Sequence, residues 1–272
     1  MSGARVKTVA AAILLLAQIA GALRVSPGVV TVRGIPVGVD TSLGIPLTCY
    51  NDSDVDVVIT VEVVKPSGVI KKWREGYDEI PDPGWLYVVG DTPFVVPAQG
   101  QISLPIRIHI PDSEAYYNQM WAAYILVTSR GGGMFNTGVA PLFMLETKTL
   151  KNPAVPPAGK IATAPSAVEM NPKSPDAKIW IYNNSDSAVE LDIFPYVPSG
   201  ERPEVEATAG WKYDPKFAEK IKVSKRHIKI KPHGKRAIKV RAKHFPTQNA
   251  EALIKISGGG ITKFVRIFWQ AH

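Results

Sequence analysis

The sequence predicts an all-β protein built from two tandem β-sandwich domains, and two observations lead to this prediction. The first is a duplication: the motif YNDSD at residues 50–54 returns as YNNSD at residues 182–186. In both copies the tyrosine is followed by Pro-Ser-Gly 16 positions later, and each half ends with a Gly-Gly-Gly triplet between two apolar runs. A repeat this long indicates a duplicated domain, because solenoid repeats are only about 20–50 residues long.

The second observation is the period of the apolar residues. Between Ile102 and Ile110 they alternate strictly with polar residues or proline, which is typical of a strand with one buried and one wet face. Pro105 lies in the wet register and lacks a backbone N–H, which marks an edge or a bulge. Pro215–Lys220 is a weak helical candidate of one or two turns. Each half offers about seven short strands, which predicts two tandem immunoglobulin-like antiparallel β-sandwich domains without a disulfide.

The N-terminus has the features of a signal peptide. Arg5 and Lys7 precede an apolar run, and small residues at 20–22 suit a cleavage site, so we expect residues 1–22 to be removed. An uncleaved anchor is the alternative. The apolar run is shorter than the roughly 20 residues of a membrane span, and no later segment is longer, so we expect no transmembrane span in the mature chain. Domain 1 then covers residues 23–150, a proline-rich linker covers 151–159, and domain 2 covers 160–272.

Cysteine usage and charge bear on location and partners. Cys49 is the single cysteine, so no intrachain disulfide can form. We interpret it as a small buried apolar residue rather than a reactive thiol. An exported chain without disulfides points to the periplasm or surface of a prokaryotic cell. Residues 23–150 carry a net charge of −4 and residues 151–272 a net charge of +10, so the excess positive charge of the chain lies in its second half.

Most of this positive charge lies between residues 212 and 243, with 13 basic and 2 acidic residues. If the two runs in this segment pair as strands, their cations gather on one sheet face, which would attract an anionic wall or glycan polymer. The alternative is a solvated strand face that blocks edge-to-edge aggregation. Intracellular nucleic acid is not an expected partner of an exported chain. The candidate residues are Lys225, Arg226, Lys229, Lys231, Lys239, Arg241 and Lys243.

The sequence offers no catalytic, cofactor or metal signature. Asp52, Asp54 and Asp56 alternate as in some calcium loops but lack the further ligands that calcium needs, so we expect an ordinary turn. The five histidines show no zinc spacing. The glycine triplet at 131–133 has no following helix to hold a phosphate. We therefore expect a protein that is not an enzyme, with no catalytic residues, cofactor or metal.

The chain resembles tandem immunoglobulin-like proteins of the bacterial envelope and, more distantly, the PapD-like periplasmic chaperones of pilus assembly. The resemblance lies in Gly84–Val89, in Pro97–Gly100, and in the alternating strand that ends at Pro111. It implies that an arginine on the first strand and a lysine near the end of the last strand of domain 1 hold the C-terminal carboxylate of a subunit. Arg33 and Lys148 are the nearest candidates.

Two functions therefore stay open. The first is an exported non-enzymatic structural or binding protein of the envelope that recognises protein or anionic polymer through sandwich edges and the basic face. The alternative is a periplasmic assembly chaperone that donates a strand to pilus-like subunits. The chaperone hypothesis predicts an exposed apolar alternation on the last strand of domain 1. That strand is apolar on both faces, so it is either buried or covered by a partner. Its candidate residues are Val139, Pro141, Phe143 and Leu145.

Overall fold

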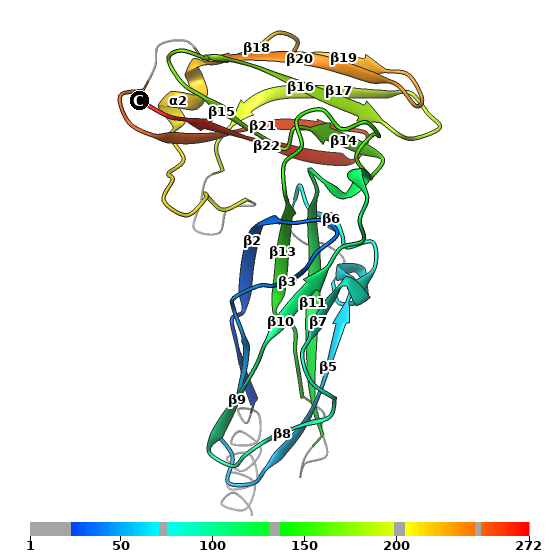
Figure 1. Ribbon diagram of the computed structural model, residues 1–272, viewed down its shortest axis with the longest axis vertical. Coiled ribbons are helices and arrows are strands. Elements are labelled where there is room, and N and C mark those ends of the chain that lie inside the picture. The colour runs from blue at the N-terminus through cyan, green and yellow to red at the C-terminus, as the bar shows by residue number, and fades with distance from the viewer. Residues whose placement is uncertain (1–22, 71–74, 131–136, 199–204, 243–245, 272) are drawn as a thin grey trace, which may run out of the picture.

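The computed structural model describes residues 23–70, 75–130, 137–198, 205–242 and 246–271. The expected signal peptide and Lys243 lie outside the described residues. Within these ranges the regular structure is mostly β, with one short α-helix, α2 (Pro215–Lys220), where the sequence predicted it. The strands form two β-sandwich bodies. Domain 1 is elongated, and domain 2 lies across its upper end (Figure 1). No described helix is long and apolar enough to cross a membrane.

Domain 1 is a sandwich of one long sheet and a layer of two shorter sheets. In spatial order the long sheet contains β2 (Val29–Ile35), β13 (Leu142–Thr147), β11 (Met120–Arg130), β5 (Val57–Val64) and β8 (Phe94–Val96), with β6 (Asp78–Glu79) and β12 (Thr137–Val139) beside β11. The facing layer contains β1 (Leu23–Ser26), β4 (Leu47–Asn51) and β9 (Gly100–Leu104), and then β3 (Asp40–Ser42), β10 (Ile106–His109) and β7 (Leu86–Val88).

The core of domain 1 follows the predicted alternation. Leu104, Ile106 and Ile108 point into the core, while their neighbours face solvent. Pro105 lies between β9 and β10 and cannot donate a backbone hydrogen bond, and the two strands pair with different neighbours. Cys49 is fully buried, and this burial raises the pKa of its thiol to about 11. The interpretation of Cys49 as a buried apolar residue is therefore confirmed.

Domain 2 is also a sandwich of two sheets. We call the sheet farther from domain 1 the outer sheet and the other the junction sheet (Figure 1). The outer sheet contains β14 (Ile161–Ala164), β16 (Asp176–Asn183), β20 (Lys235–Ala242) and β18 (Ile221–Val223) in spatial order. The junction sheet contains β15 (Ala167–Met170), β22 (Ile261–Trp269), β21 (Ala250–Gly258), β17 (Val189–Tyr196) and β19 (His227–Ile230).

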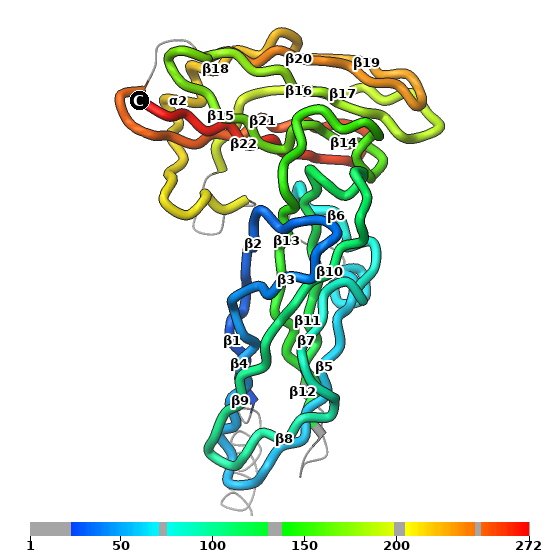
Figure 2. The backbone as a smooth tube through the Cα atoms, in the orientation of Figure 1, coloured from blue at the N-terminus to red at the C-terminus, as the bar shows by residue number. Residues whose placement is uncertain are grey.

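The duplication seen in the sequence is also present in the topology. In domain 1, β1 pairs with β4 in one layer, and β2 then pairs in parallel with β13 in the other. In domain 2, β14 pairs with β16, and β15 pairs in parallel with β22. In each domain the chain passes from one layer to the other at a cis-proline, which is Pro27 in domain 1 and Pro165 in domain 2. Figure 2 shows the first of these crossings, where the blue strands run up the side of domain 1 to reach β13.

The junction sheet packs on the outer face of the long sheet. Ala122 and Tyr124 of β11 and Met144 of β13 contact Leu253 of β21 and Phe264 of β22 in one apolar cluster. β11 and β13 are therefore apolar on both faces because one face lines the core of domain 1 and the other lies against domain 2.

Candidate binding sites at the domain junction

The two domains meet around a buried cluster of charged side chains. The carboxylate of Glu146, in β13, accepts hydrogen bonds from Nε and Nη2 of Arg266, in β22, at 2.9 Å and 2.6 Å. Tyr77 donates a further hydrogen bond to it at 2.6 Å. The side chains of Arg266 and Glu146 are only 4% and 10% exposed. Such a pair holds the domains together, because removing either partner leaves the other charge buried and uncompensated.

Arg266 also fixes the loop that precedes α2. Its Nη1 donates to Oε1 of Glu251 at 2.5 Å and to the backbone carbonyl of Glu206 at 3.1 Å. Glu251 accepts from the backbone N–H of Thr208 at 2.7 Å. Arg33 of domain 1 donates to the same Glu206 carbonyl at 2.7 Å. The loop is thereby tied to both domains at one point.

The burial of this cluster shifts the protonation equilibria of its members. Burial alone would raise the pKa of Glu146, but the charge and hydrogen bonds of Arg266 prevail, and the pKa lies below its usual value. Burial likewise opposes the charged form of Arg266, yet the Glu146 carboxylate raises its pKa. The pKa of Tyr77 is raised by burial and by the Glu146 charge. At neutral pH, Glu146 and Arg266 are therefore an ion pair, and Tyr77 is the neutral donor.

Sequence reasoning did not find most of this cluster. Arg266 and Glu251 each stand alone in an apolar run, at Val265–Ile267 and Ala250–Ala252. A single charged residue in a buried strand needs a partner, because an unpaired buried charge is strongly unfavourable. That signal was available in the sequence. Which partner each charge meets depends on how the domains pack.

A cavity of about 190 Å³ lies beside the cluster and brings together the two residues that the family resemblance singled out. Arg33 of β2 and Lys148, just after β13, both line it, together with Arg266 of domain 2. Arg33 is 22% exposed, and its Nε lies 3.4 Å from the Glu146 carboxylate. Within the described residues, Arg33 Nε is a buried side-chain nitrogen without a hydrogen bond. The cavity therefore has three cations, Arg33, Lys148 and Arg266, and one carboxylate, Glu146, on its wall.

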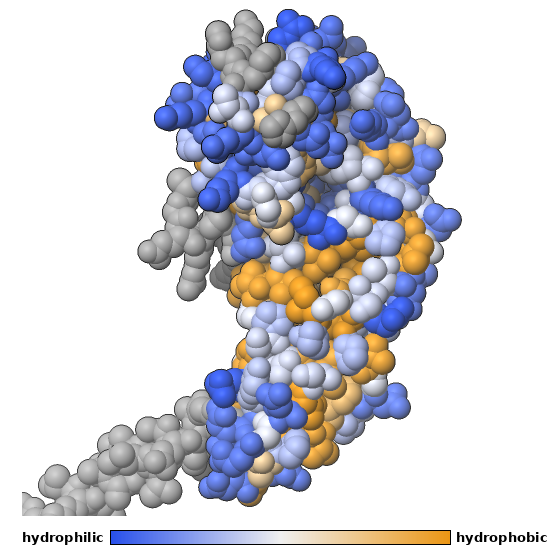
Figure 3. Space-filling view, turned by 60° about the vertical axis from the view of Figure 1, so that its left-hand side comes forward, coloured by the Kyte–Doolittle hydropathy of each residue, from blue (hydrophilic) through white to orange (hydrophobic). Residues whose placement is uncertain are grey.

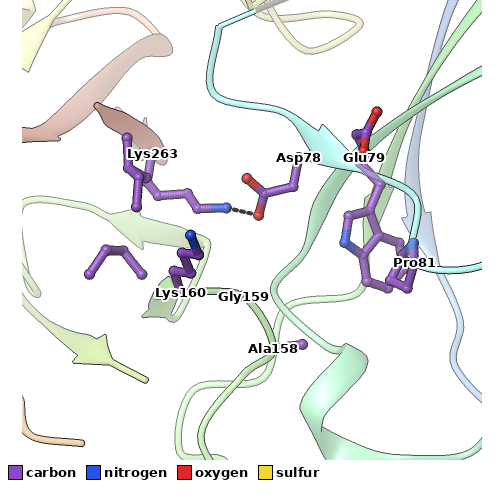
Figure 4. Close-up of a pocket in the computed structure, with 10 residues that line it drawn as sticks. Asp78, Glu79, Pro81, Ala158, Gly159, Lys160 and Lys263 are labelled. Atoms are coloured by element: carbon purple, nitrogen blue, oxygen red, sulfur yellow. Dashed lines mark hydrogen bonds and ion pairs between the residues drawn. The ribbon is translucent and has the colours of Figure 1, made fainter. Parts of the chain in front are cut away.

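A second cavity of about 280 Å³ opens elsewhere on the junction, between Trp121 of domain 1 and Ile161 and Ile261 of domain 2. Figure 4 shows the Lys263 ammonium pointing at the Asp78 carboxylate, with which it forms an ion pair. Asp78 and Lys263 thus compensate each other across the domains, while Glu79 and Lys160 also lie on the wall of this cavity. We interpret this contact as a second link between the domains.

The four apolar candidates on the last strand of domain 1 are not exposed as a row. Phe143 and Leu145 of β13 are fully buried in the core of domain 1. Pro141 is buried, and Val139, in β12, is half-buried. β13 is paired on both sides, with β11 and with β2. The sequence left open whether this strand is buried or is covered by a partner. In the structure it is buried within its own chain, so the exposed apolar row that the chaperone hypothesis predicted is not present on β13.

The edge of the long sheet is formed by β2 instead. Among the described strands, β2 pairs with β13 on one side and with none on the other. Its first residue, Val29, is 47% exposed. Figure 3 shows apolar side chains in a band on domain 1, below the mostly hydrophilic domain 2. Most large apolar side chains that are exposed in the described residues belong to domain 1, including Val39, Val55 and Val95. Domain 1 therefore has the surface better suited to an apolar partner.

The pairing expected between the two basic runs occurs only in part: β18 of the first run pairs with β20 of the second, but the strand that holds Lys229 does not. β19 pairs with β17 in the junction sheet, whereas β20 pairs with β16 and β18 in the outer sheet. Lys229 and Lys239 therefore lie in opposite layers of domain 2. The cause is topological, because the chain crosses from one sheet to the other between these strands, and alternation alone cannot reveal such a crossing.

The remaining candidates of the basic segment are distributed accordingly. Lys229 in the junction sheet forms an ion pair with Glu190 at 2.9 Å. Lys225 and Arg226 are exposed before β19, and Lys231 is exposed just after it. Lys239 and Arg241 are exposed on the outer sheet. The seven cations therefore do not form one face.

The chain is similar in structure to two-domain periplasmic chaperones over nearly its whole length. The crystal structure of the periplasmic chaperone SfaE matches with a TM-score of 0.33 and 12% identity, covering 91% of this chain and all of that one. The Escherichia coli chaperone DraB matches with a TM-score of 0.32 and 14% identity, covering 92% of this chain and 96% of that one. A protein of unknown function from Porphyromonas gingivalis W83 has a TM-score of 0.38 and 13% identity, covering 92% and 100%.

No protein-family model matches the chain, and no curated protein matches it.

Proposed function

We propose that this protein is an exported assembly chaperone that captures β-rich subunits of the cell envelope. The capture site would combine the open edge of β2 with the cavity lined by Arg33 and Lys148. The observation that carries this proposal is the position of Arg33. It lies near the end of an unpaired edge strand and lines the same cationic cavity as Lys148.

The open edge supports strand capture. An edge strand presents backbone donors and acceptors that another chain can use, and recognition by strand addition draws its affinity from these groups. β2 extends over Val29–Ile35 and runs toward the junction, where Arg33 meets Glu146. A subunit strand added parallel to β2 would therefore bring its C-terminus to the cavity.

The cavity suits the end of a chain better than a small-molecule ligand. Its volume of about 190 Å³ is below the roughly 300 Å³ at which ligand pockets begin. A terminal carboxylate there would meet Arg33 and Lys148, and a charge-assisted hydrogen bond in a partly buried site is about twice as strong as a neutral one. Arg33 is already oriented by Glu146 and by the Glu206 carbonyl.

The test is capture of subunits from the native envelope fraction by the purified protein, with identification by mass spectrometry. We expect a one-to-one complex with a small β-rich protein that survives high salt, because backbone pairing and apolar contact are not screened. Lys148→Glu should weaken capture about tenfold or more by repelling the carboxylate. Its side chain is exposed, so folding is not at risk.

The matched control is Lys151→Glu, which makes the same charge change at an exposed linker position outside the cavity. It should capture as well as the wild type. A subunit that lacks its C-terminal residue should bind the wild type as weakly as the intact subunit binds Lys148→Glu. Equal capture by all variants, or retention on wall material without a stoichiometric protein, would reject the chaperone proposal. It would favour the alternative of a surface-binding protein.

A further inference from the structure

The outer sheet of domain 2 carries a basic face that combines two of the predicted cations, Lys239 and Arg241, with three that were not among the candidates. In a strand, alternate residues point to the same side. Ile179, Ile238 and Val240 point into the core, so their neighbours face outward. The register places Lys178 opposite Lys239, and Arg241 lies between Asp176 and Lys222. We define the basic sheet face by its exposed cations, which are Lys178, Lys222, Lys235, Lys239 and Arg241.

Aromatic rings hold part of this face in place. The ammonium group of Lys178 lies 4.0 Å from the ring centre of Trp180, and that of Lys235 lies 4.9 Å from the same ring. Lys235 also lies 5.7 Å from the ring centre of Tyr182. Contacts of this kind between an ammonium group and the face of an aromatic ring are attractive. The two ammonium groups are therefore fixed beside a half-buried indole instead of moving freely.

The charge of the face is compensated at only one position. Arg241 forms a two-point contact with Asp176, at 2.5 Å and 2.7 Å. Among the described residues of this face, Lys178, Lys222, Lys235 and Lys239 have no carboxylate partner. The corresponding face of β17 and β19 differs, because Lys229 pairs with Glu190 and His227 with Asp192. Among the described residues, the strand face of the outer sheet thus carries more cations without an ion pair than the strand face of β17 and β19 does.

We propose that the basic sheet face binds a linear acidic polysaccharide of the cell envelope. The four free cations are lysines, whose ammonium groups act as point charges, while the one arginine fork that could grip a phosphate in a two-point contact is occupied by Asp176. Trp180 adds a partly exposed ring on which the apolar face of a sugar can pack. A flat strand face suits a long polymer, and the site lies on the side of domain 2 away from domain 1 (Figure 1).

This inference is independent of the proposed subunit capture, which uses domain 1 and the junction. Together they give a chaperone that works while held on envelope glycan. Variants of the basic sheet face should therefore leave subunit capture unchanged, and Lys148→Glu should leave glycan binding unchanged.

The experiment measures binding of the purified protein to polygalacturonate, with neutral dextran and polyphosphate for comparison, over a range of salt concentrations. We expect salt-sensitive binding to polygalacturonate and none to dextran. The double variant Lys178→Ala/Lys239→Ala should weaken it about tenfold or more and lower the slope of log affinity against log salt by roughly 1–2. Trp180→Leu should weaken binding to polygalacturonate but not to polyphosphate.

The control is Lys229→Ala/Lys231→Ala, which removes the same net charge from the junction-sheet side of domain 2. It should bind polygalacturonate within about twofold of the wild type, since its two lysines are not on the face. Equal losses in the two double variants would show attraction by net charge alone and overturn the proposal. The proposal would also be overturned if the protein bound polyphosphate more tightly than polygalacturonate and the double variant Lys178→Ala/Lys239→Ala left polyphosphate binding unchanged.

Discussion

At the scale of single residues, the repeated motif has a structural cause. Asn51 is buried, and its Nδ2 donates to the carbonyls of Val55, Val96 and Pro97 at 2.8–3.2 Å. Its Oδ1 accepts from the backbone N–H of Ser53 at 3.0 Å. One side chain thereby closes its own turn and holds the end of β8.

Asn183 makes the same contacts in domain 2. Its Nδ2 donates to Ser187, Ile230 and Lys231 at 2.7–3.2 Å, and its Oδ1 accepts from the backbone of Ser185 at 3.1 Å. The Asn-x-Ser pattern was kept in both halves because each sandwich needs the same buried amide at the same corner.

We therefore predict that Asn51→Ala destabilises domain 1 and Asn183→Ala destabilises domain 2, each by about 2 kcal/mol or more, since several buried backbone groups lose their partner. Calorimetry of each variant should show the single unfolding transition of the two-domain unit moved down in temperature. Asn152→Ala, at an exposed linker position, should change neither. A shift below about 0.5 kcal/mol in both variants would contradict this account.

Glu146 gives a prediction about pH. Its pKa in the folded protein lies below the usual 4.5, because the effect of Arg266 exceeds that of burial. A carboxyl group with a lowered folded pKa adds stability above its unfolded pKa and loses that contribution as the pH falls through the folded pKa. The wild type should thus lose stability as the pH drops below about 4.5 more steeply than Glu146→Gln does.

Urea unfolding measured from about pH 6 to pH 3 checks this prediction. Glu169→Gln is the control, because Glu169 is exposed on β15. Its pH profile should follow that of the wild type. Parallel profiles for the wild type and Glu146→Gln would mean that the ion pair with Arg266 contributes nothing in acid.

At the scale of elements, the sequence was a good guide to what each strand is and a poor guide to its neighbours. Alternation predicted the strand that Pro105 divides, and the weak helical candidate at Pro215–Lys220 is α2. The placement of β19 and β20 in different layers was not predicted, because period two states which residues share a face and not which sheet the strand joins. The prediction that Lys229 and Lys239 lie on one sheet face was therefore wrong.

For the candidate site, too, the sequence indicated individual residues but not the contacts between distant parts of the chain. The family resemblance led to Arg33 and Lys148, which line one cavity. Arg266 and Tyr77 were missed, because their role depends on a contact between residues 120 and 69 positions apart in the chain. Contacts across a domain boundary leave no local period in a sequence.

The burial of β13 changes what a test on this strand can show. Phe143 is fully buried in the domain 1 core, so Phe143→Asp would unfold the domain and could not report on partner capture. We predict that even Phe143→Ala lowers the free energy of unfolding of domain 1 by about 3–5 kcal/mol. Val58→Ala, which removes a 37% exposed side chain from β5, should cost less than about 0.5 kcal/mol. Equal effects of the two changes in chemical denaturation would show that β13 is not a core strand.

At the scale of the whole molecule, the junction makes the two domains one unit. The apolar cluster around Phe264, the Asp78–Lys263 pair, and the Glu75–Lys255 pair at 3.0 Å all cross it. Arg266 adds the buried pair with Glu146. This matters for the proposed capture, because the cavity takes Arg33 and Lys148 from one domain and Arg266 from the other. Its shape depends on the angle between the domains.

We therefore predict that Arg266→Ala loosens this angle. The change leaves Glu251 buried without its cation and Glu146 with only the longer contact to Arg33, which should cost about 3–5 kcal/mol. The wild type should unfold in a single calorimetric transition and the variant in two, and small-angle scattering should report a larger radius of gyration for the variant. Arg226→Ala, which removes an exposed arginine from the same domain, should behave as the wild type. If Arg266→Ala keeps one transition and an unchanged radius, the apolar cluster alone sets the angle. If the angle loosens, subunit capture should fall with it although Lys148 is intact, because the carboxylate would meet a cavity whose walls no longer hold a fixed distance.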